Sequence, residues 1–225
     1  MRRALVFLLL LSTAASVQAA QIKFFLGPAV STYTGRWPSD VFPDPMGRPS
    51  GLNPFRNKRT GSLQGFGLEF PLKPWLGVEI DGLYFALGSS FTSPTAFFTV
   101  QREIYDLEGL SVPILAKLKP RAGLFPYFLA GVDFVFVLYH ARTSLVLPEA
   151  GVIYREIARE DLMLATRKLD WQPVVGIGFE VTVLKQTFFT EARYRLGMMD
   201  LVKGFPASDA AARIRSLCFV VGYRM

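Results

Sequence analysis

The sequence predicts an all-β protein, an eight-stranded antiparallel up-and-down transmembrane β-barrel formed by residues 20–225, with a signal peptide at 1–19. Three observations predict this fold class. The N-terminal segment has the form of a cleavable export signal, the rest of the chain holds eight segments of alternating polarity, and one face of those segments carries no charge. Together they lead us to expect a protein exported to a bacterial outer membrane.

The N-terminal segment has the three parts of a secretory signal. Arg2 and Arg3 precede the apolar run Ala4–Leu11, and small residues follow as far as Ala19. Because the run falls short of the roughly 20 residues that span a bilayer, we expect cleavage rather than a retained anchor, with a mature chain that starts near Ala20.

The composition is apolar, with 51% hydrophobic residues, 20 Phe and a mean hydropathy of +0.30. Helical membrane spans would explain it, but the longest apolar stretch, Phe125–Tyr139, is interrupted by Asp133. A membrane-spanning backbone must satisfy its hydrogen bonds internally, which leaves helices and closed barrels. The absence of apolar stretches long enough for a helical span therefore favours a barrel.

The charge and the cysteine content exclude several classes. The net charge of +7 becomes +5 without Arg2 and Arg3, and no Lys/Arg-rich block or stacking motif accompanies it, so no nucleic-acid partner is expected. The single Cys218 cannot form an internal disulfide. No Cys/His cluster, phosphate loop or nucleotide fingerprint is present, and we expect neither a metal nor a cofactor.

Eight segments alternate with period 2, as strands do. They are separated by connections that are alternately long and short, as in outer-membrane barrels with short periplasmic turns and longer external loops. The predicted strands are 22–34, 61–71, 76–88, 103–118, 126–139, 169–183, 187–199 and 215–225, and the long loops are Gly35–Thr60, Ser89–Arg102, His140–Lys168 and Asp200–Ile214. Within the third loop, Val152–Ala165 fits either a short helix or an extension of the flanking strands.

Successive side chains of a strand point to opposite faces, and the two faces differ sharply. One face is apolar and uncharged, with members such as Phe24, Ile80, Ile114, Phe134 and Val221. The other holds glycines and charges: Lys23, Glu69, Glu79, Asp81, Lys117, Asp133, Glu180, Glu191, Arg193, Arg195 and Arg224.

Volume decides which face is inside. A packed eight-stranded interior holds on the order of a dozen large side chains, whereas the apolar face supplies roughly thirty. We therefore expect the apolar face to meet lipid and the charged face to form a polar lumen with small side chains. Six acids and five bases there favour structural ion pairs over a proton or ion path.

Five segments follow one another in a fixed order and spacing along the chain: Leu110–Lys117, Pro126–Gly131, Val175–Glu180, Glu191–Gly197 and Val221–Arg224. With these segments the chain resembles the small outer-membrane barrels of the PorT type and, more distantly, OmpA-like and OmpX-like barrels. The resemblance implies an eight-stranded barrel, contact with the barrel-assembly machinery, and a secretion-associated role by analogy. This chain departs from it by ending on Met225, where such barrels end on Phe.

Asp106 and Glu108 share the parity of the apolar Leu110. A bulge near Gly109, or a position above the membrane, would explain them.

The sequence also leaves one enzymatic alternative open. His140, Ser144 and Glu149 faintly resemble the residues of outer-membrane lipid A deacylases, which would imply an acyl-ester hydrolase. The spacing fits that family poorly, and His140 is expected in a loop as a solvated side chain.

A second candidate is an aromatic and basic cluster in the first loop, which could bind lipopolysaccharide or a protein, or simply be solvated. Its members are Arg36, Trp37, Arg48, Phe55, Arg56, Lys58 and Arg59. Three function classes follow: a non-enzymatic barrel with binding loops that supports the envelope or secretion, a narrow pore for small solutes, and the lipid enzyme. The expected partners are membrane lipid, lipopolysaccharide and envelope or secretion proteins.

Overall fold

The computed structural model describes residues 20–34, 55–94, 100–120, 126–147, 155–184, 186–201 and 213–225. The predicted signal peptide at 1–19 lies outside these residues. The described residues form nine strands: β1 Gln21–Thr34, β2 Phe55–Lys73, β3 Leu76–Pro94, β4 Val100–Leu118, β5 Tyr127–Leu147, β6 Arg155–Asp161, β7 Leu169–Val183, β8 Gln186–Leu196 and β9 Arg213–Arg224.

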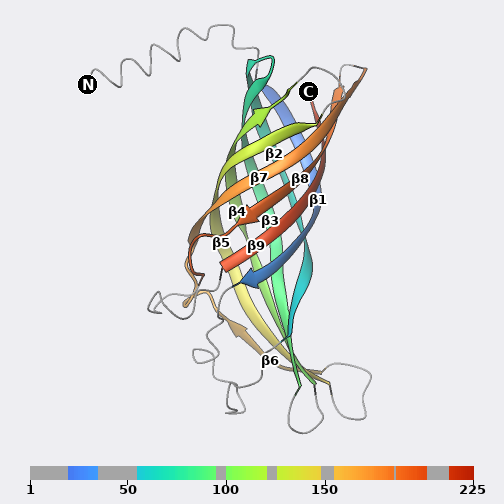
Figure 1. Cartoon of the computed structure of the whole chain (residues 1–225). Helices are drawn as coiled ribbons and strands as arrows, with labels where there is room; N and C mark the ends of the chain where they lie inside the picture. The colour runs from blue at the N-terminus through green and yellow to red at the C-terminus, as the bar shows by residue number, and fades with distance from the viewer. Residues whose placement is uncertain are drawn as a thin grey trace, which may run out of the picture.

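Eight of these strands close into a barrel (Figure 1). Each pairs in antiparallel fashion with its neighbour, from β1 through β5 and then β7 to β9, and β9 pairs with β1 to complete the ring. Closure leaves no open sheet edge in the ring. The predicted fold class is confirmed.

The two ends of the barrel differ. Tight connections join β2 to β3 and β7 to β8 at one end, where Met225 also pairs with Ile22 through backbone hydrogen bonds of 3.1 Å. The strand ends that border the longer connections lie at the opposite end, together with β6, which pairs only with β5 (Figure 1). We call these the short-turn end and the loop end.

The strands reach further toward the loop end than the sequence predicted. Phe55–Thr60, Ser89–Pro94, Val100–Arg102 and Arg213–Ile214, all expected in loops, belong to strands, and β5 continues from His140 to Leu147. For Val152–Ala165 the structure favours the extended alternative, because Arg155–Asp161 is strand β6. We call residues 87–94, 100–107, 140–147 and 155–161 the external extension.

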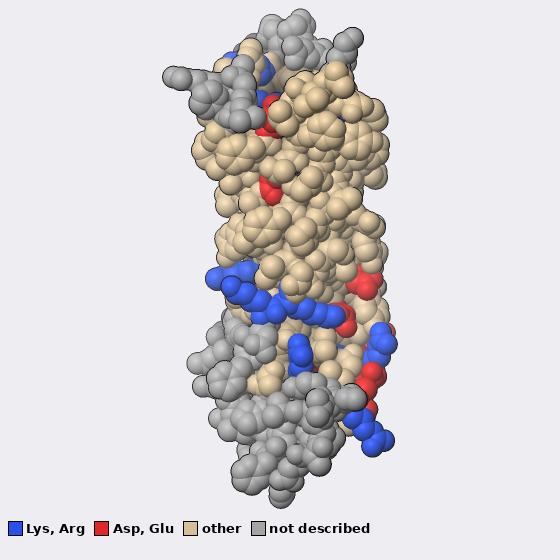
Figure 2. Space-filling model, turned by 90° about the vertical axis from the view of Figure 1, so that its right-hand side faces the viewer, with Lys and Arg blue, Asp and Glu red and all other residues tan. Residues whose placement is uncertain are grey.

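The outside of the barrel carries an apolar wall. Its side chains are about half exposed and come from every strand of the ring; they include Phe24, Leu26, Phe66, Ile80, Leu110, Ile114, Phe128, Phe134, Leu138, Val175, Ile177, Phe179, Phe188, Leu217, Phe219, Val221, Tyr223 and Met225. In Figure 2 the wall appears as a broad tan band with few charges, bordered by Lys and Arg side chains. An apolar surface of this size cannot face water, so the outer wall meets lipid.

The described part of the chain contains no helix with the length and apolar character needed to cross a bilayer.

A β-bulge lies where the outer wall ends. Glu108 pairs with Tyr139 but the next residue, Gly109, pairs with Val137, so Leu138 is the extra residue on β5. β4 keeps its alternation, and Asp106 and Glu108 therefore remain outside at the border of the wall. Asp106 forms an ion pair with Arg59, and Glu108 accepts a hydrogen bond of 2.6 Å from the Tyr84 hydroxyl.

The lumen differs from the predicted one in an important respect: it is not only polar and small. Toward the loop end it is filled by a buried apolar core that includes Phe25, Tyr33, Leu63, Leu83, Phe85, Leu87, Tyr105, Leu107, Val135, Val137, Phe189, Ile214, Cys218 and Val220. From the sequence we predicted that the large apolar residues lie on the outside. The large apolar residues on the same strand face as the lumen charges were not predicted.

Candidate functional site

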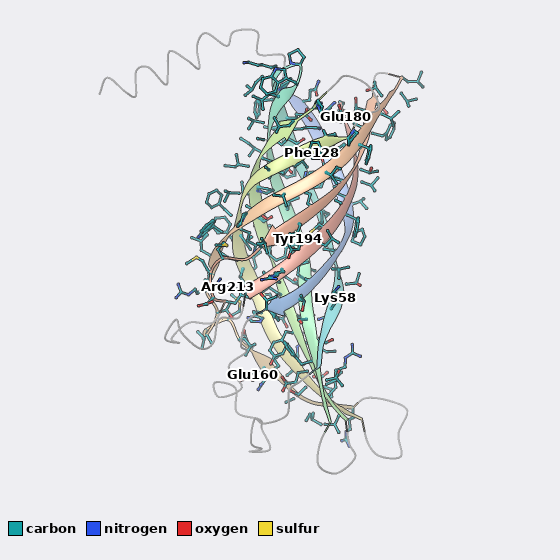
Figure 3. All side chains as sticks on the ribbon, in the orientation of Figure 1. Lys58, Phe128, Glu160, Glu180, Tyr194 and Arg213 are labelled. Carbon is teal, nitrogen blue, oxygen red and sulfur yellow. The ribbon has the colours of Figure 1, made fainter. Side chains whose placement is uncertain are left out.

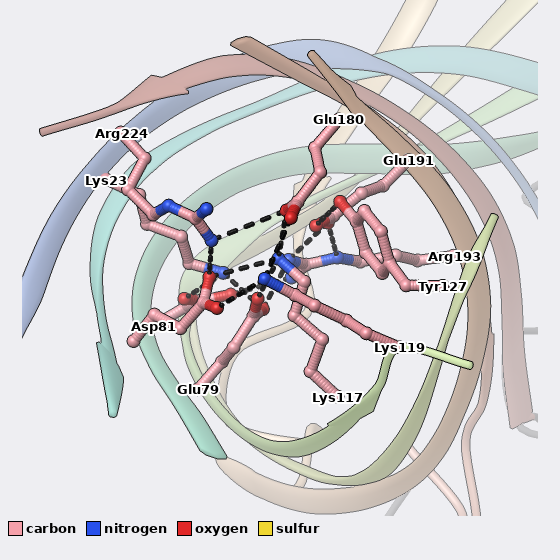
Figure 4. Close-up of polar contacts among 11 residues, drawn as sticks. Lys23, Glu79, Asp81, Lys117, Lys119, Tyr127, Glu180, Glu191, Arg193 and Arg224 are labelled. Atoms are coloured by element: carbon pink, nitrogen blue, oxygen red, sulfur yellow. Dashed lines mark hydrogen bonds and ion pairs between the residues drawn. The ribbon is translucent and has the colours of Figure 1, made fainter. Parts of the chain in front are cut away.

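An ionic cluster fills the lumen near the short-turn end (Figure 4). It consists of five bases and five acids: Lys23, Lys117, Lys119, Arg193, Arg224, Glu69, Glu79, Asp81, Glu180 and Glu191. These side chains come from seven of the eight barrel strands and from the residue that follows β4. Because the formal charges balance, the cluster is neutral as a whole.

Glu79 lies at the centre of this cluster. Its carboxylate is fully buried and forms ion pairs with Lys23, with Lys117 at 3.2 Å and with Arg193 at 3.6 Å. Lys23 also reaches Asp81 at 2.9 Å, and Arg193 reaches the same carboxylate at 2.7 Å. A buried charge is tolerated only when it is paired, and each of these charges has at least two partners.

The part nearest the short-turn end joins Glu69, Glu180 and three bases. Glu69 pairs with Lys117 at 3.0 Å and with Arg224, while Lys119 bridges Glu69 and Glu180 at 3.2 and 2.8 Å. Lys119 was not predicted as a lumen residue, because it lies one residue beyond β4. Its parity matches that of Lys117, and this signal would have found it.

Tyr127 extends the cluster toward β8. Its hydroxyl donates a hydrogen bond of 2.7 Å to Glu191, which also pairs with Arg193 at 2.5 Å. Tyr127 lies directly opposite Gly178 on β7, and a β-carbon at that glycine would come within 2.4 Å of the tyrosine ring. Glycine therefore makes room for an aromatic side chain inside the narrow barrel.

Asp133 and Arg195 form a separate ion pair above the cluster, with both side chains buried. A cavity of about 10 Å³ beside them is lined by residues that include Arg193, Arg195 and Cys218. A space of that size holds about one water molecule.

The eleven charged lumen residues predicted from the sequence thus lie on the inner face, where they pair with one another or with Lys119. With the apolar core above them, they fill the lumen at two levels.

A second buried group, around His140, lies at the loop end. The Thr166 hydroxyl donates to the carbonyl of Leu162 at 2.7 Å and so accepts from Nδ1 of His140, also at 2.7 Å. Nε2 is then the acceptor for the Tyr33 hydroxyl at 3.2 Å. His140 is therefore a neutral imidazole with both nitrogens engaged, and it fixes the turn that follows β6 to the barrel.

His140 lies beyond the outer wall, beside Leu107 in the external extension. Burial lowers the pKa of His140 to about 4, and the negative charge of Asp161 opposes the shift only weakly. The neutral form is the stable one at neutral pH.

The structure does not bring the residues of the catalytic alternative together. His140 is 1% exposed, so its interpretation as a solvated loop residue was wrong. Ser144 is also buried and lies four residues further along the same strand, about 13 Å away at the rise of a β-strand. The two side chains cannot share a proton across that distance, and Glu149 lies outside the described residues.

The loop cluster proposed from the sequence is only partly described. Arg36, Trp37 and Arg48 lie outside the described residues, and Phe55 and Arg56 belong to β2 with side chains that are not described. Lys58 is exposed. Arg59 lies over the outside of β4, where it pairs with Asp106 and donates to the carbonyl of Tyr105 at 3.3 Å.

The external extension has an ion-pair network of its own. Arg142 pairs with Glu160 of β6 at 2.6 Å and approaches Glu103 at 4.0 Å, and Glu103 accepts a hydrogen bond of 2.8 Å from the Tyr105 hydroxyl. All seven residues of β6 are exposed. The extension therefore projects beyond the closed ring, with β6 exposed along its whole length (Figure 1).

These features define a class of protein: a small closed β-barrel with a lipid-facing outside and a filled lumen. Several solved structures resemble this chain. They include Ail, the attachment invasion locus protein of Yersinia pestis, crystallised with the heparin analogue sucrose octasulfate, at 11% identity over 92% of this chain and 100% of that one, with a TM-score of 0.41.

Two more are Neisserial surface protein A, at 10% identity over 92% and 99% of the two chains with a TM-score of 0.41, and the outer-membrane protein OprG from Pseudomonas aeruginosa, at 12% identity over 93% and 97% with a TM-score of 0.39. No protein-family model matches the chain, and no curated protein does.

Proposed function

We propose that this chain is a bacterial outer-membrane protein that is closed to solutes and acts through its loop end, by binding a surface or secretion-associated partner. The observation that carries the proposal is the double filling of the lumen. Ten charged side chains form a neutral cluster at one level, and a buried apolar core occupies the other. Since the interior has no room for transport, the exposed extension is the part that remains available for contact.

The placement in an outer membrane rests on two features of the chain. The outer wall fits the hydrocarbon layer, and the barrel satisfies its backbone hydrogen bonds without an open edge in the ring. The export signal expected at 1–19 supplies the route. Separation of inner and outer membranes by density, followed by detection of the protein in the outer fraction, tests this placement.

The narrow pore is the alternative that the filled lumen argues against most directly. Purified protein in a planar bilayer is expected to give no reproducible channels. Steady unitary conductance at neutral pH would replace our proposal with the pore. The deacylase alternative has no support in the positions of His140 and Ser144.

The sequence also indicates which class of partner the loop end binds. The residue-level resemblance to PorT-type barrels favours a component of a secretion apparatus. Affinity purification of the tagged protein from membranes, with heat-modifiable gel migration read on the same sample, tests both parts of the proposal. Co-purification of secretion or envelope proteins with a heat-shifted barrel supports it, and a band that does not shift on boiling contradicts the barrel in the membrane.

A further inference from the structure

A row of cationic side chains lies at the loop-end border of the outer wall (Figure 2). On the outer face of β9 the sequence changes from Arg213 and Arg215, both exposed, to Leu217 and Phe219, which face lipid. Two residues along a strand cover about 7 Å. The cations of β9 therefore start where the hydrocarbon layer ends, at the depth of lipid headgroups.

The neighbours of Arg215 leave its charge uncompensated. The register places Arg215 beside Thr32 of β1 and beside Leu196 of β8, so no carboxylate lies directly opposite on either strand. Among the described residues, no ion pair involves Arg215. Arg213 lies opposite Thr34 and has one carboxylate contact, with Asp200 at 3.4 Å.

The same border on β7 adds two more exposed cations. Arg167 and Lys168 immediately precede Leu169 and Trp171, which are 51% and 43% exposed on the outer wall. The backbone amide of Arg167 donates to the carbonyl of Leu201 at 2.6 Å. Leu201 follows Asp200, which is the partner of Arg213. The segment after β8 therefore contacts both Arg167, just before β7, and Arg213 of β9.

The opposite side of the barrel has a different border. There Asp106 and Glu108 point outward, and they are bound by Arg59 and Tyr84. At the short-turn end, the exposed Lys73 lies over the ring of Trp75, 5.4 Å from its centroid. Over β7 to β9, by contrast, the described residues at the border gather four exposed bases, Arg167, Lys168, Arg213 and Arg215, against one acid, Asp200.

We propose that Arg167, Lys168, Arg213 and Arg215 form a binding site for the phosphorylated headgroup of an outer-leaflet glycolipid of the lipid A type. Arginine forms paired hydrogen bonds with phosphate oxygens, which suits a dianionic headgroup. The acyl chains of such a lipid lie along Leu217, Phe219 and Val175, below the cations. Figure 3 places Arg213 between Tyr194 of the wall and Glu160 of the extension, as a headgroup site requires.

This inference rests on the proposed placement in the outer membrane, and it names a lipid partner for the outside of the barrel. The test uses full-length mature protein folded into phosphatidylcholine nanodiscs that contain diphosphoryl lipid A. Native mass spectrometry counts the lipid A molecules retained per barrel as lipid A is titrated. The variants are R213Q/R215Q, with R167Q added in a second step, and the matched control is Lys73→Gln at the other rim.

We expect R213Q/R215Q to weaken lipid A retention at least tenfold, a further loss with R167Q, and no change with Lys73→Gln. Wild-type protein titrated with dephosphorylated lipid A supplies a measurement that does not depend on the folding of any variant, and its retention is expected to fall by a similar factor. Equal retention of the phosphorylated and dephosphorylated lipids would overturn the site. Heat-modifiable migration in the same discs reports the barrel separately, so a folded barrel without lipid preference removes this inference and leaves the proposed function intact.

Discussion

Two isoleucines on the outside of this protein are equally exposed but lie in different surroundings. Ile114 of β4 exposes 44% of its side chain, and Ile157 of β6 exposes 42%. Ile114 lies between Ile80 and Val132 in the middle of the outer wall. Ile157 is the extra residue of a bulge in the β5–β6 pairing, among the charges of Arg155–Asp161. Exposure alone does not identify the solvent; the neighbouring side chains do.

The same contrast extends to the charges of the two regions. Within the barrel, most charged side chains point inward and are buried, whereas the charged side chains of β6 in the external extension are exposed. The barrel and the extension thus place their charged side chains differently, and the border between the two regions lies at the bulge of Leu138. If this border is real, the same kind of substitution should cost far more stability on the barrel side than on the side of the extension.

The largest expected effect comes from Glu79→Gln in the ionic cluster. The change leaves Lys23, Lys117 and Arg193 with one uncompensated positive charge in a buried site. Breaking a buried pair by removing one partner costs roughly 3–5 kcal/mol. The urea midpoint for unfolding in lipid vesicles, read by heat-modifiable gel migration, should fall accordingly.

The matched control is Glu160→Gln, which removes the partner of Arg142 in the extension. The side chain of Glu160 is 48% exposed, and pairs of this kind contribute about 0–1 kcal/mol. If the two variants lost equal stability, the distinction between a buried cluster and a hydrated extension would be lost.

Arginine at the two isoleucine positions should have the next largest effect. Ile114→Arg places a charge in the hydrocarbon layer, which costs roughly 2–4 kcal/mol near the bilayer midplane. Ile157→Arg adds a charge to a hydrated strand, where substitutions usually stay within about 0.5 kcal/mol. The same urea titration compares them, and a tolerated Ile114→Arg would show that the outer wall does not meet lipid.

A smaller, pH-dependent effect is expected from His140. Because burial lowers its pKa to about 4 in the folded state, the unfolded chain binds the proton first as the pH falls below 6.5. The contribution of His140 to stability is complete above pH 6.5, declines by about 1.4 kcal/mol per pH unit below it, and stops declining near pH 4. His140→Gln should flatten the pH dependence of the thermal midpoint in this window. Identical slopes for the two proteins would contradict the buried, neutral imidazole.

The sequence predicted the barrel because lipid imposes a simple rule on every spanning strand. In each strand every second side chain is uncharged where it faces the outer wall. This alternation located the eight strands and the charged lumen residues to within a few positions. The strand ends at the loop side were missed because Ser89–Pro94 and Val100–Arg102 lie beyond the lipid, where no face needs to be uniformly apolar.

The composition of the lumen was harder to predict. Phe25, Phe85 and Phe189 share the inward parity of the charged residues, but volume alone does not say how many large side chains the interior accepts when glycines face them. The burial of His140 depended on Tyr33, 107 residues away, and on Thr166 in a turn. Contacts of this kind are set by the closure of the ring and leave no periodic signal in the chain.

The most direct test of the closed lumen uses Cys218, the single cysteine of the chain, which is 1% exposed and faces the lumen from β9. Wild-type protein folded into vesicles is treated with N-ethylmaleimide on both sides of the bilayer, and the mass of the protein is read before and after heating in detergent. We predict that Cys218 does not react in the folded barrel and reacts completely once the barrel is unfolded. Rapid labelling of the folded protein would contradict a filled lumen.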